Sequence, residues 1–141
     1  MSEILTLRIR LSGARGEDHK WRRVIEIPED VSLEDLHYTI QDLVNFDNDH
    51  MYEFYIGRSW RQHKMEIGEA ATPEDPGENE KIQLSDVYPL EKNLKVYYWF
   101  DFGDSWIFEI TRRAGTKAPN RRAKYPRVVE KEGRNPPQYS W

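Results

Sequence analysis

Two runs of alternating apolar residues flank a short turn in the last third of the chain. The alternating residues, all in one phase, are Val96, Tyr98, Phe100, Trp106, Phe108 and Ile110. A period of two is the pattern of a half-buried strand. The intervening Asp101-Phe102-Gly103-Asp104 is typical of a turn, with Gly103 expected to supply a positive φ. The sequence therefore predicts an aromatic hairpin with one face in the core.

A second hairpin and one helix are predicted in the first third of the chain. Residues 5–11 alternate apolar with polar, residues 12–19 suit a turn, and residues 21–27 form a second strand ended by Pro28. Ser32 and Asp35 form an acidic capping box at the start of a helix. The apolar face of that helix holds Leu33, Leu36, Ile40, Leu43 and Val44.

The remaining segments complete the predicted order. A third strand is expected from about His50 to Ile56, and Leu84 to Val87 suits a single helical turn. Residues 66–80 are acidic, rich in Pro and Gly and without apolar period, which predicts a mobile loop. Residues 112–141 predict a basic, irregular C-terminal segment. This order predicts a single α+β domain over residues 1–141, with a mixed β-sheet, one main helix on a face and a β-grasp-like arrangement.

Composition excludes several function classes. The 141 residues contain no cysteine, so disulfides, thiol catalysis and thiolate metal sites are excluded. The first residues lack the pattern of a signal peptide, and the longest apolar run is the five residues 96–100, so we expect a cytoplasmic protein without a membrane span. The four histidines are 13 to 18 residues apart with no metal-binding pair, and we expect neither metal nor cofactor.

Charge is distributed unevenly along the chain. Residues 24–109 carry 20 acids and 6 bases, whereas residues 112–134 carry 9 bases and 2 acids. The basic segment could contact phosphates, or it could fold back on the acidic body. The candidate nucleic-acid contacts are Arg112, Arg113, Lys117, Arg121, Arg122, Lys124 and Arg127. Because the whole chain is acidic, with a net charge of −4, nucleic acid is the less favoured partner.

A small set of residues around the aromatic turn could form a ligand or partner surface. Asp101 and Asp104 could be paired carboxylates for acid–base work, or they could bind the backbone amides of the turn. His50 with Glu53 resembles a hydrolase pair in composition only, because a strand would point the two side chains to opposite faces. Trp99 and Tyr97 fall on the face away from the core. The candidate surface therefore comprises His50, Trp99, Asp101 and Asp104.

Several motifs together resemble one known family. They are Trp21-Arg22-Arg23-Val24, His50-x-Tyr52-Glu53-Phe54-x-Ile56-Gly57, Leu84-Ser85-Asp86, Phe100-Asp101-Phe102-Gly103-Asp104-x-Trp106, Tyr125-Pro126-Arg127 and Pro136-Pro137. In this order they resemble the plasmid pRiA4b ORF-3-like family, also described as passenger proteins of transposable elements. The chain departs from the family pattern at Phe108, often His, at Gln138-Tyr139 and in its lack of cysteine. The resemblance implies a fold and a link to mobile DNA, and no activity.

These observations favour a non-catalytic binding or interaction module associated with mobile genetic elements. Two alternatives stay open. The first is a nucleic-acid-binding accessory protein that uses the basic segment, and the second is a hydrolase-like enzyme that uses the turn carboxylates. A deep pocket holding Asp101, Asp104 and His50 would favour the enzyme. The sequence identifies no ligand, partner or oligomeric state.

Overall fold

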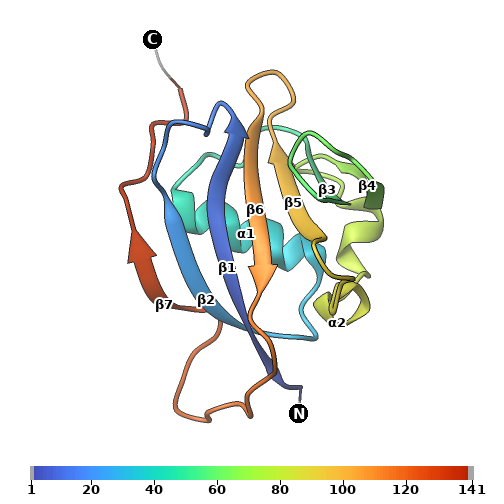
Figure 1. Ribbon diagram of the computed structural model, residues 1–141, viewed down its shortest axis with the longest axis vertical. Coiled ribbons are helices and arrows are strands. Elements are labelled where there is room, and N and C mark those ends of the chain that lie inside the picture. The colour runs from blue at the N-terminus through green and yellow to red at the C-terminus, as the bar shows by residue number, and fades with distance from the viewer. Residues whose placement is uncertain (1, 140–141) are drawn as a thin grey trace.

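One seven-stranded sheet with a helix across one face forms the molecule, as seen in a computed structural model that describes residues 2–139 (Figure 1). Its strands are β1 (Ile4–Ala14), β2 (Arg22–Pro28), β3 (Tyr52–Gly57), β4 (Met65–Ala71), β5 (Lys95–Phe100), β6 (Trp106–Arg112) and β7 (Arg127–Glu132). Its helices are α1 (Leu33–Val44), the 3-10 turn η1 (Gly77–Glu80) and α2 (Leu84–Val87). The α+β class is confirmed.

The strands follow the order β4-β3-β5-β6-β1-β2-β7 across the sheet. Each of the six pairings is antiparallel, so the prediction of a mixed sheet is wrong. Neighbours along the chain supply three of these pairings through hairpins, which need only short turns and give antiparallel strands. These pairings do not confirm a β-grasp-like arrangement.

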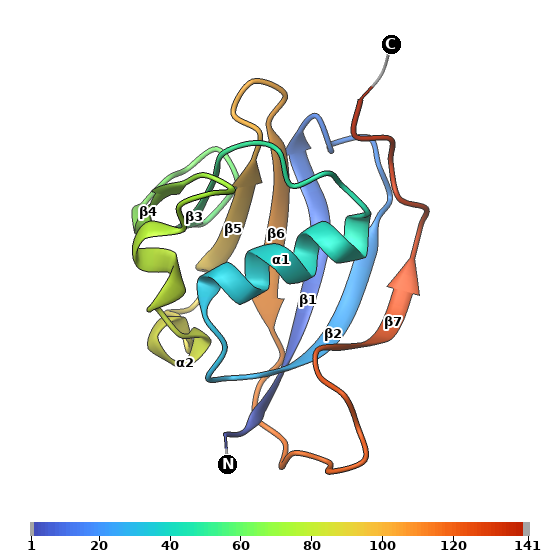
Figure 2. The same ribbon diagram turned by 180° about the vertical axis from the view of Figure 1, so that it is seen from behind.

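The aromatic hairpin and the helix form the core as predicted. Trp106, Phe108 and Ile110 on β6 are buried in one cluster with Leu36 and Ile40 of α1. Figure 2 shows α1 lying diagonally across the strands on this face. The predicted capping box is present, because Ser32 Oγ accepts from the Asp35 amide and Asp35 accepts from the Ser32 amide.

The turn of the aromatic hairpin is built differently from the prediction. Positive φ occurs at Asp101 (61°) and Ser105 (59°), and Gly103 is not among the positive-φ glycines. Asp tolerates the left-handed region because its short side chain can bond locally. Here Asp101 Oδ1 accepts from the Asp104 amide at 3.2 Å. Asp101 therefore adopts the positive φ that was expected at Gly103, and its carboxylate holds the turn through this hydrogen bond.

Two polar segments are more regular than predicted. Residues 66–80 contain most of β4 and all of η1, so the prediction that the whole segment is a loop is wrong, whereas its mobility stays a prediction. The prediction that residues 112–141 are irregular is also wrong, because β7 lies within them and pairs with β2. Residues 140 and 141 of this segment lie outside the described range. Both strands are at the sheet edges, where side chains face solvent and apolar alternation is not needed.

Candidate functional site

The predicted residues His50 and Asp101 meet at one end of the sheet. His50 precedes β3 instead of lying within it, and Asp101 opens the β5–β6 turn. The His50 Nε2 atom lies 3.4 Å from Asp101 Oδ2. Asp101 is buried, with its backbone amide bonded to the Met51 carbonyl. The turn and the segment before β3 are thus joined through both backbone and side chains.

The C-terminal segment completes this cluster and was not predicted to do so. Tyr139 donates its hydroxyl proton to Asp49 Oδ2, and this bond raises the pKa of Tyr139. The hydroxyl oxygen is then available to accept from His50 Nε2 at 2.8 Å. Gln138 bonds the Asp47 backbone through both its amide oxygen and its amide nitrogen. We call the set of His50, Asp101, Asp49, Gln138 and Tyr139 the rim clasp.

Asp104 lies in a neighbouring pocket, separate from the rim clasp. This rim pocket of about 560 Å³ is lined by Arg15, His19, Asp104, Trp106 and Pro137. Arg15 Nη1 lies 3.7 Å from Asp104 Oδ1. Neither His50 nor Asp101 lines the rim pocket, so the three predicted acid–base residues do not share one cavity.

Trp99 lies on the opposite face of the sheet from α1. Its indole Nε1 donates to Ser105 Oγ at 3.1 Å, and its ring packs 4.2 Å from that of Phe102. The expectation that Tyr97 is exposed is wrong, because only 1% of it is accessible. Tyr97 belongs to a second cluster with Tyr55 and Ile107, with Trp60 packed against it. Residues that follow β3 therefore cover part of the face that was expected to be open.

The predicted basic contacts divide into two groups. Lys117 and Arg127 both bond the buried Glu26 carboxylate, at 2.8 and 2.6 Å, and these bonds lower the pKa of Glu26. Arg113 pairs with Glu130, and Arg112 donates to the Gly115 carbonyl. These four cations therefore bond within the protein. Arg121, Arg122 and Lys124 are exposed and form no ion pair among the described residues.

A groove between α1 and the β7 edge was missed by the sequence argument. This α1–β7 groove has a volume of about 620 Å³ and is lined by Ile27, Val31, Asp35, Tyr38, Thr39, Asp42, Leu43 and Pro126. Tyr38 is 42% exposed there, although its ring is apolar. Seven of these residues lie within residues 27–43, whereas Pro126 comes from the segment just before β7, so no local pattern indicates the groove.

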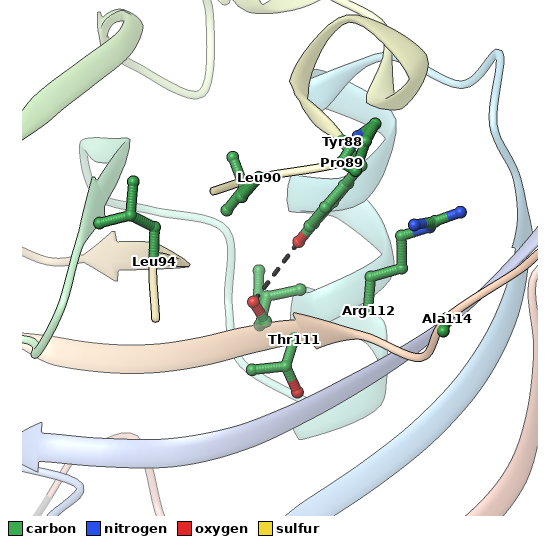
Figure 3. Close-up of a pocket in the computed structure, with 8 residues that line it drawn as sticks. Tyr88, Pro89, Leu90, Leu94, Thr111, Arg112 and Ala114 are labelled. Carbon is green, nitrogen blue, oxygen red and sulfur yellow. Dashed lines mark hydrogen bonds between the residues drawn. The ribbon is translucent and has the colours of Figure 1, made fainter. Parts of the chain in front are cut away.

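A smaller pocket lies where β6 ends near α2. It measures about 250 Å³, and its apolar lining includes Leu90, Leu94 and Ile110 (Figure 3). The Tyr88 hydroxyl donates to the Ile110 carbonyl at 3.4 Å, and burial raises the pKa of Tyr88. This pocket presents no acid–base pair.

Metal-binding clusters and membrane-spanning helices are both absent from residues 2–139. Within the described part of the chain, no group of three or more His, Asp or Glu side chains could hold a metal ion. Across residues 2–139, no helix has the length and apolar character needed to cross a membrane.

Comparisons with known proteins agree with this fold. No curated protein matches the chain. A crystal structure of a protein of unknown function, MM3350 from Methanosarcina mazei Go1, superposes with a TM-score of 0.75 at 23% identity, covering 98% of this chain and 74% of that one. The plasmid pRiA4b ORF-3-like family matches residues 3–139, which include the rim clasp and the aromatic hairpin. The chain therefore belongs to the plasmid pRiA4b ORF-3-like family.

Proposed function

We propose that the protein is a non-catalytic interaction module of the cytoplasm, associated with mobile genetic elements. One observation carries the non-catalytic part: the acid–base side chains of the rim clasp bond to one another and to the C-terminal segment. The association with mobile elements is supported by the description of the family alone.

The geometry of the rim clasp favours a structural role for His50. Because the Tyr139 hydroxyl donates to Asp49, the His50 Nε2 atom that meets it acts as a donor. His50 Nε2 also faces Asp101 Oδ2, while Asp101 Oδ1 accepts from the Asp104 amide of the turn. A general base must instead reach a proton of the substrate within hydrogen-bond distance. The clasp thus joins three chain segments at one end of the sheet.

The non-catalytic proposal is tested with His50→Gln and Asp101→Asn. We expect both variants to increase hydrogen exchange over residues 46–50 and 134–139, because they loosen the clasp. Turnover of activated ester and phosphodiester substrates should equal the buffer blank for wild type and variants. Asp104→Asn is the matched control, because it removes a nearby charge outside the clasp. Wild-type turnover that disappears in a folded Asp101→Asn variant would make the protein an enzyme.

The interaction part of the proposal is tested by identifying a partner directly. Affinity capture from the native cell, followed by calorimetry with the purified partner, should give a defined stoichiometry. Single substitutions at the α1–β7 groove and at the rim pocket then locate the contact. A purified chain that binds no captured protein, with nucleic acid recovered in its place, would favour the second candidate.

Nucleic-acid binding is the second candidate function, favoured by Arg121, Arg122 and Lys124. These exposed cations lie on the long loop between β6 and β7, which extends beyond the sheet at the lower end of Figure 1. Because the body is acidic, we expect binding to duplex and single strands no tighter than about 10⁻⁵ M at physiological salt. Fluorescence anisotropy across a salt series measures this. Sub-micromolar binding, with the salt slope lowered by about two in Arg121→Ala/Arg122→Ala, would make nucleic acid the partner.

A further inference from the structure

We propose that the α1–β7 groove and the free edge of β7 together bind a cationic, extended segment of a partner protein. The segment adds to the sheet as an eighth strand beside β7 and turns every second side chain, apolar or cationic, toward the groove. This inference rests on the proposed function as an interaction module, and it names the surface and the chemistry of the partner.

The edge of β7 is open to a further strand. β7 is the last strand of the sheet and pairs with β2 alone (Figures 1 and 2). An edge strand presents backbone amides and carbonyls on its outer side that have no neighbour in the sheet. Addition of an extended peptide to such an edge is a common mode of recognition, with main-chain hydrogen bonds supplying affinity.

The strand register places Val128 of β7 on the groove side. Val128 lies opposite Ile25, and directly opposed residues of antiparallel strands share one face of the sheet. Ile25 and Ile27 belong to the core cluster beneath α1, so Val128 also faces the helix side. Pro126, two residues before Val128, lines the groove itself. The wall of the groove therefore continues outward along β7.

Exposed apolar side chains gather at this surface. Tyr38, Val128 and Val129 are all more than 40% exposed, and Tyr38 lines the groove while the two valines lie on β7. The other large apolar residues exposed within the described chain are Met51 and Met65. Grouped exposure of apolar side chains marks interaction surfaces, whereas single ones need no explanation.

The charge of the groove selects a cationic partner. Asp35 and Asp42 line it, and no Lys or Arg does. Arg127 of β7 bonds to Glu26, and Glu26 points to the other face of the sheet because it lies between the inward-facing Ile25 and Ile27. Lys131 of β7 lies opposite Arg23, at the end of the strand away from Pro126 and the groove. A second copy paired antiparallel through β7 would bring two acidic grooves together on one face. The acidic side chains of the two grooves would repel each other, so self-pairing is disfavoured and a basic partner is favoured.

The test uses a fluorescent eight-residue peptide in which valine and lysine alternate at the odd positions and threonine fills the even positions, so that valine and lysine share one face of the strand. We expect saturable binding by anisotropy at low ionic strength, with increased protection of residues 127–132 from hydrogen exchange. A matched peptide with glutamate in place of each lysine should bind at least tenfold more weakly. Asp42→Lys should weaken the lysine peptide about fivefold, which is the scale for reversal of an exposed charge. Glu74→Lys is the control, because it makes the same charge change at an exposed residue outside the groove.

Methylated peptides distinguish strand addition from simple charge attraction. In an extended strand, alternate amides point to the same side. One lysine–valine peptide is N-methylated at every odd position and another at every even position. Strand addition predicts that one of them loses at least tenfold in affinity while the other binds as before. Equal binding of both methylated forms, equal binding of the glutamate peptide, or no effect of Asp42→Lys would each overturn the inference, as would a β7-dependent dimer in sedimentation.

The two proposals fail in different ways. Turnover that depends on Asp101 would overturn the proposed function without any peptide experiment. A native partner that binds at the rim pocket and is insensitive to Asp42→Lys and Val128→Lys would overturn the docking inference alone.

Discussion

Strand β6 lies between β5 and β1 near the middle of the sheet, whereas β7 has one neighbour, β2. The side chains of β6 alternate into a core that also contains α1, and five of its seven residues are buried. All six residues of β7 are exposed, and its contacts include the ion pair between Arg127 and Glu26. Apolar burial therefore fixes the centre of the sheet, whereas backbone pairing and charge fix the edge.

The largest effect that separates the two regions is expected at Trp106. Its side chain is 1% exposed and packs against Phe46 with ring centroids 4.9 Å apart. Trp106→Ala should lower the free energy of unfolding by about 3–5 kcal/mol, as truncation of a buried aromatic side chain does. Val128→Ala on β7 should change it by no more than about 0.5 kcal/mol. Denaturant unfolding measures the free energy of unfolding of both variants. Similar losses in the two would contradict the distinction between the centre and the edge of the sheet.

A second effect concerns a buried polar group under the helix. His37 stacks on Tyr52, accepts a hydrogen bond from the Tyr98 hydroxyl at Nδ1 and donates to Asn48 Oδ1 at 2.8 Å. Burial lowers the pKa of His37 to about 4 from 6.5. Because the unfolded chain then binds more protons between these values, stability rises with pH across this window.

The measurement for His37 is urea unfolding at pH 7.5 and pH 4.5. The histidine contributes a loss of about 2–3 kcal/mol at the lower pH, since one pKa unit corresponds to about 1.4 kcal/mol. Carboxyl groups also titrate in this range, so the informative quantity is the difference from His37→Gln, which cannot be protonated. A variant with the same pH dependence as the wild type would contradict the expected effect.

A third, smaller effect sharpens the account of the edge. Glu26 is 4% exposed and accepts from both Lys117 and Arg127. Glu26→Gln removes the charge that these cations neutralise, and we expect a loss of about 1–2 kcal/mol, because both cations are themselves largely exposed and screened. Hydrogen exchange should increase in β7 and not in β6. Glu130→Gln, at an exposed pair with Arg113, is the control and should have a smaller effect.

The pH dependence of the Glu26 contribution comes from bonds that stabilise the charged carboxylate, whereas that of His37 comes from burial that destabilises the charged imidazole. The bonds from Lys117 and Arg127 lower the pKa of Glu26 below 4.5 in the folded protein. Its stabilising contribution is therefore complete above the unfolded value and is lost as the pH falls through the folded one. Wild type and Glu26→Gln should accordingly converge in stability under strongly acidic conditions.

Sequence reasoning predicted those elements that carry their own local pattern. The aromatic hairpin alternates with a period of two, and α1 begins at the Ser32–Asp35 capping box, so both were predicted and confirmed. Strands β4 and β7 lack such a pattern because their side chains face solvent, and only pairing with β3 and β2 makes them strands. Local patterns therefore locate the centre of a sheet better than its edges.

The same reasoning explains what was missed at the candidate sites. His50 and Asp101 were named as candidates, but Asp49 and Tyr139 are 90 positions apart and are joined only by the path of the C-terminal segment. The α1–β7 groove likewise depends on Pro126 lying beside a helix that ends at Val44. Contacts between distant segments leave no periodic pattern in the sequence.

The smallest predicted effect concerns Gly103 in the turn of the central hairpin. The turn sequence predicts a positive φ at Gly103 and therefore a loss of stability in Gly103→Ala. In the structure the positive φ values fall on Asp101 and Ser105, and a Cβ at Gly103 would have only Asp101 Oδ1 nearby, at an ordinary 3.5 Å. Alanine should then stabilise the protein by about 0.4–1 kcal/mol, because it reduces the freedom of the unfolded chain.

Gly133, just beyond β7, is the matched glycine at the edge. Its φ is +82°, and a Cβ there would lie 1.7 Å from the Lys20 carbonyl oxygen, so Gly133→Ala must displace the backbone. The two alanine variants should therefore change the free energy of unfolding in opposite directions, as measured by urea titration. Because β7 is held by backbone pairing, this backbone shift should disrupt the edge strand although no side chain is lost. Destabilisation by Gly103→Ala would mean that the turn carboxylate does not hold the hairpin and that the glycine does.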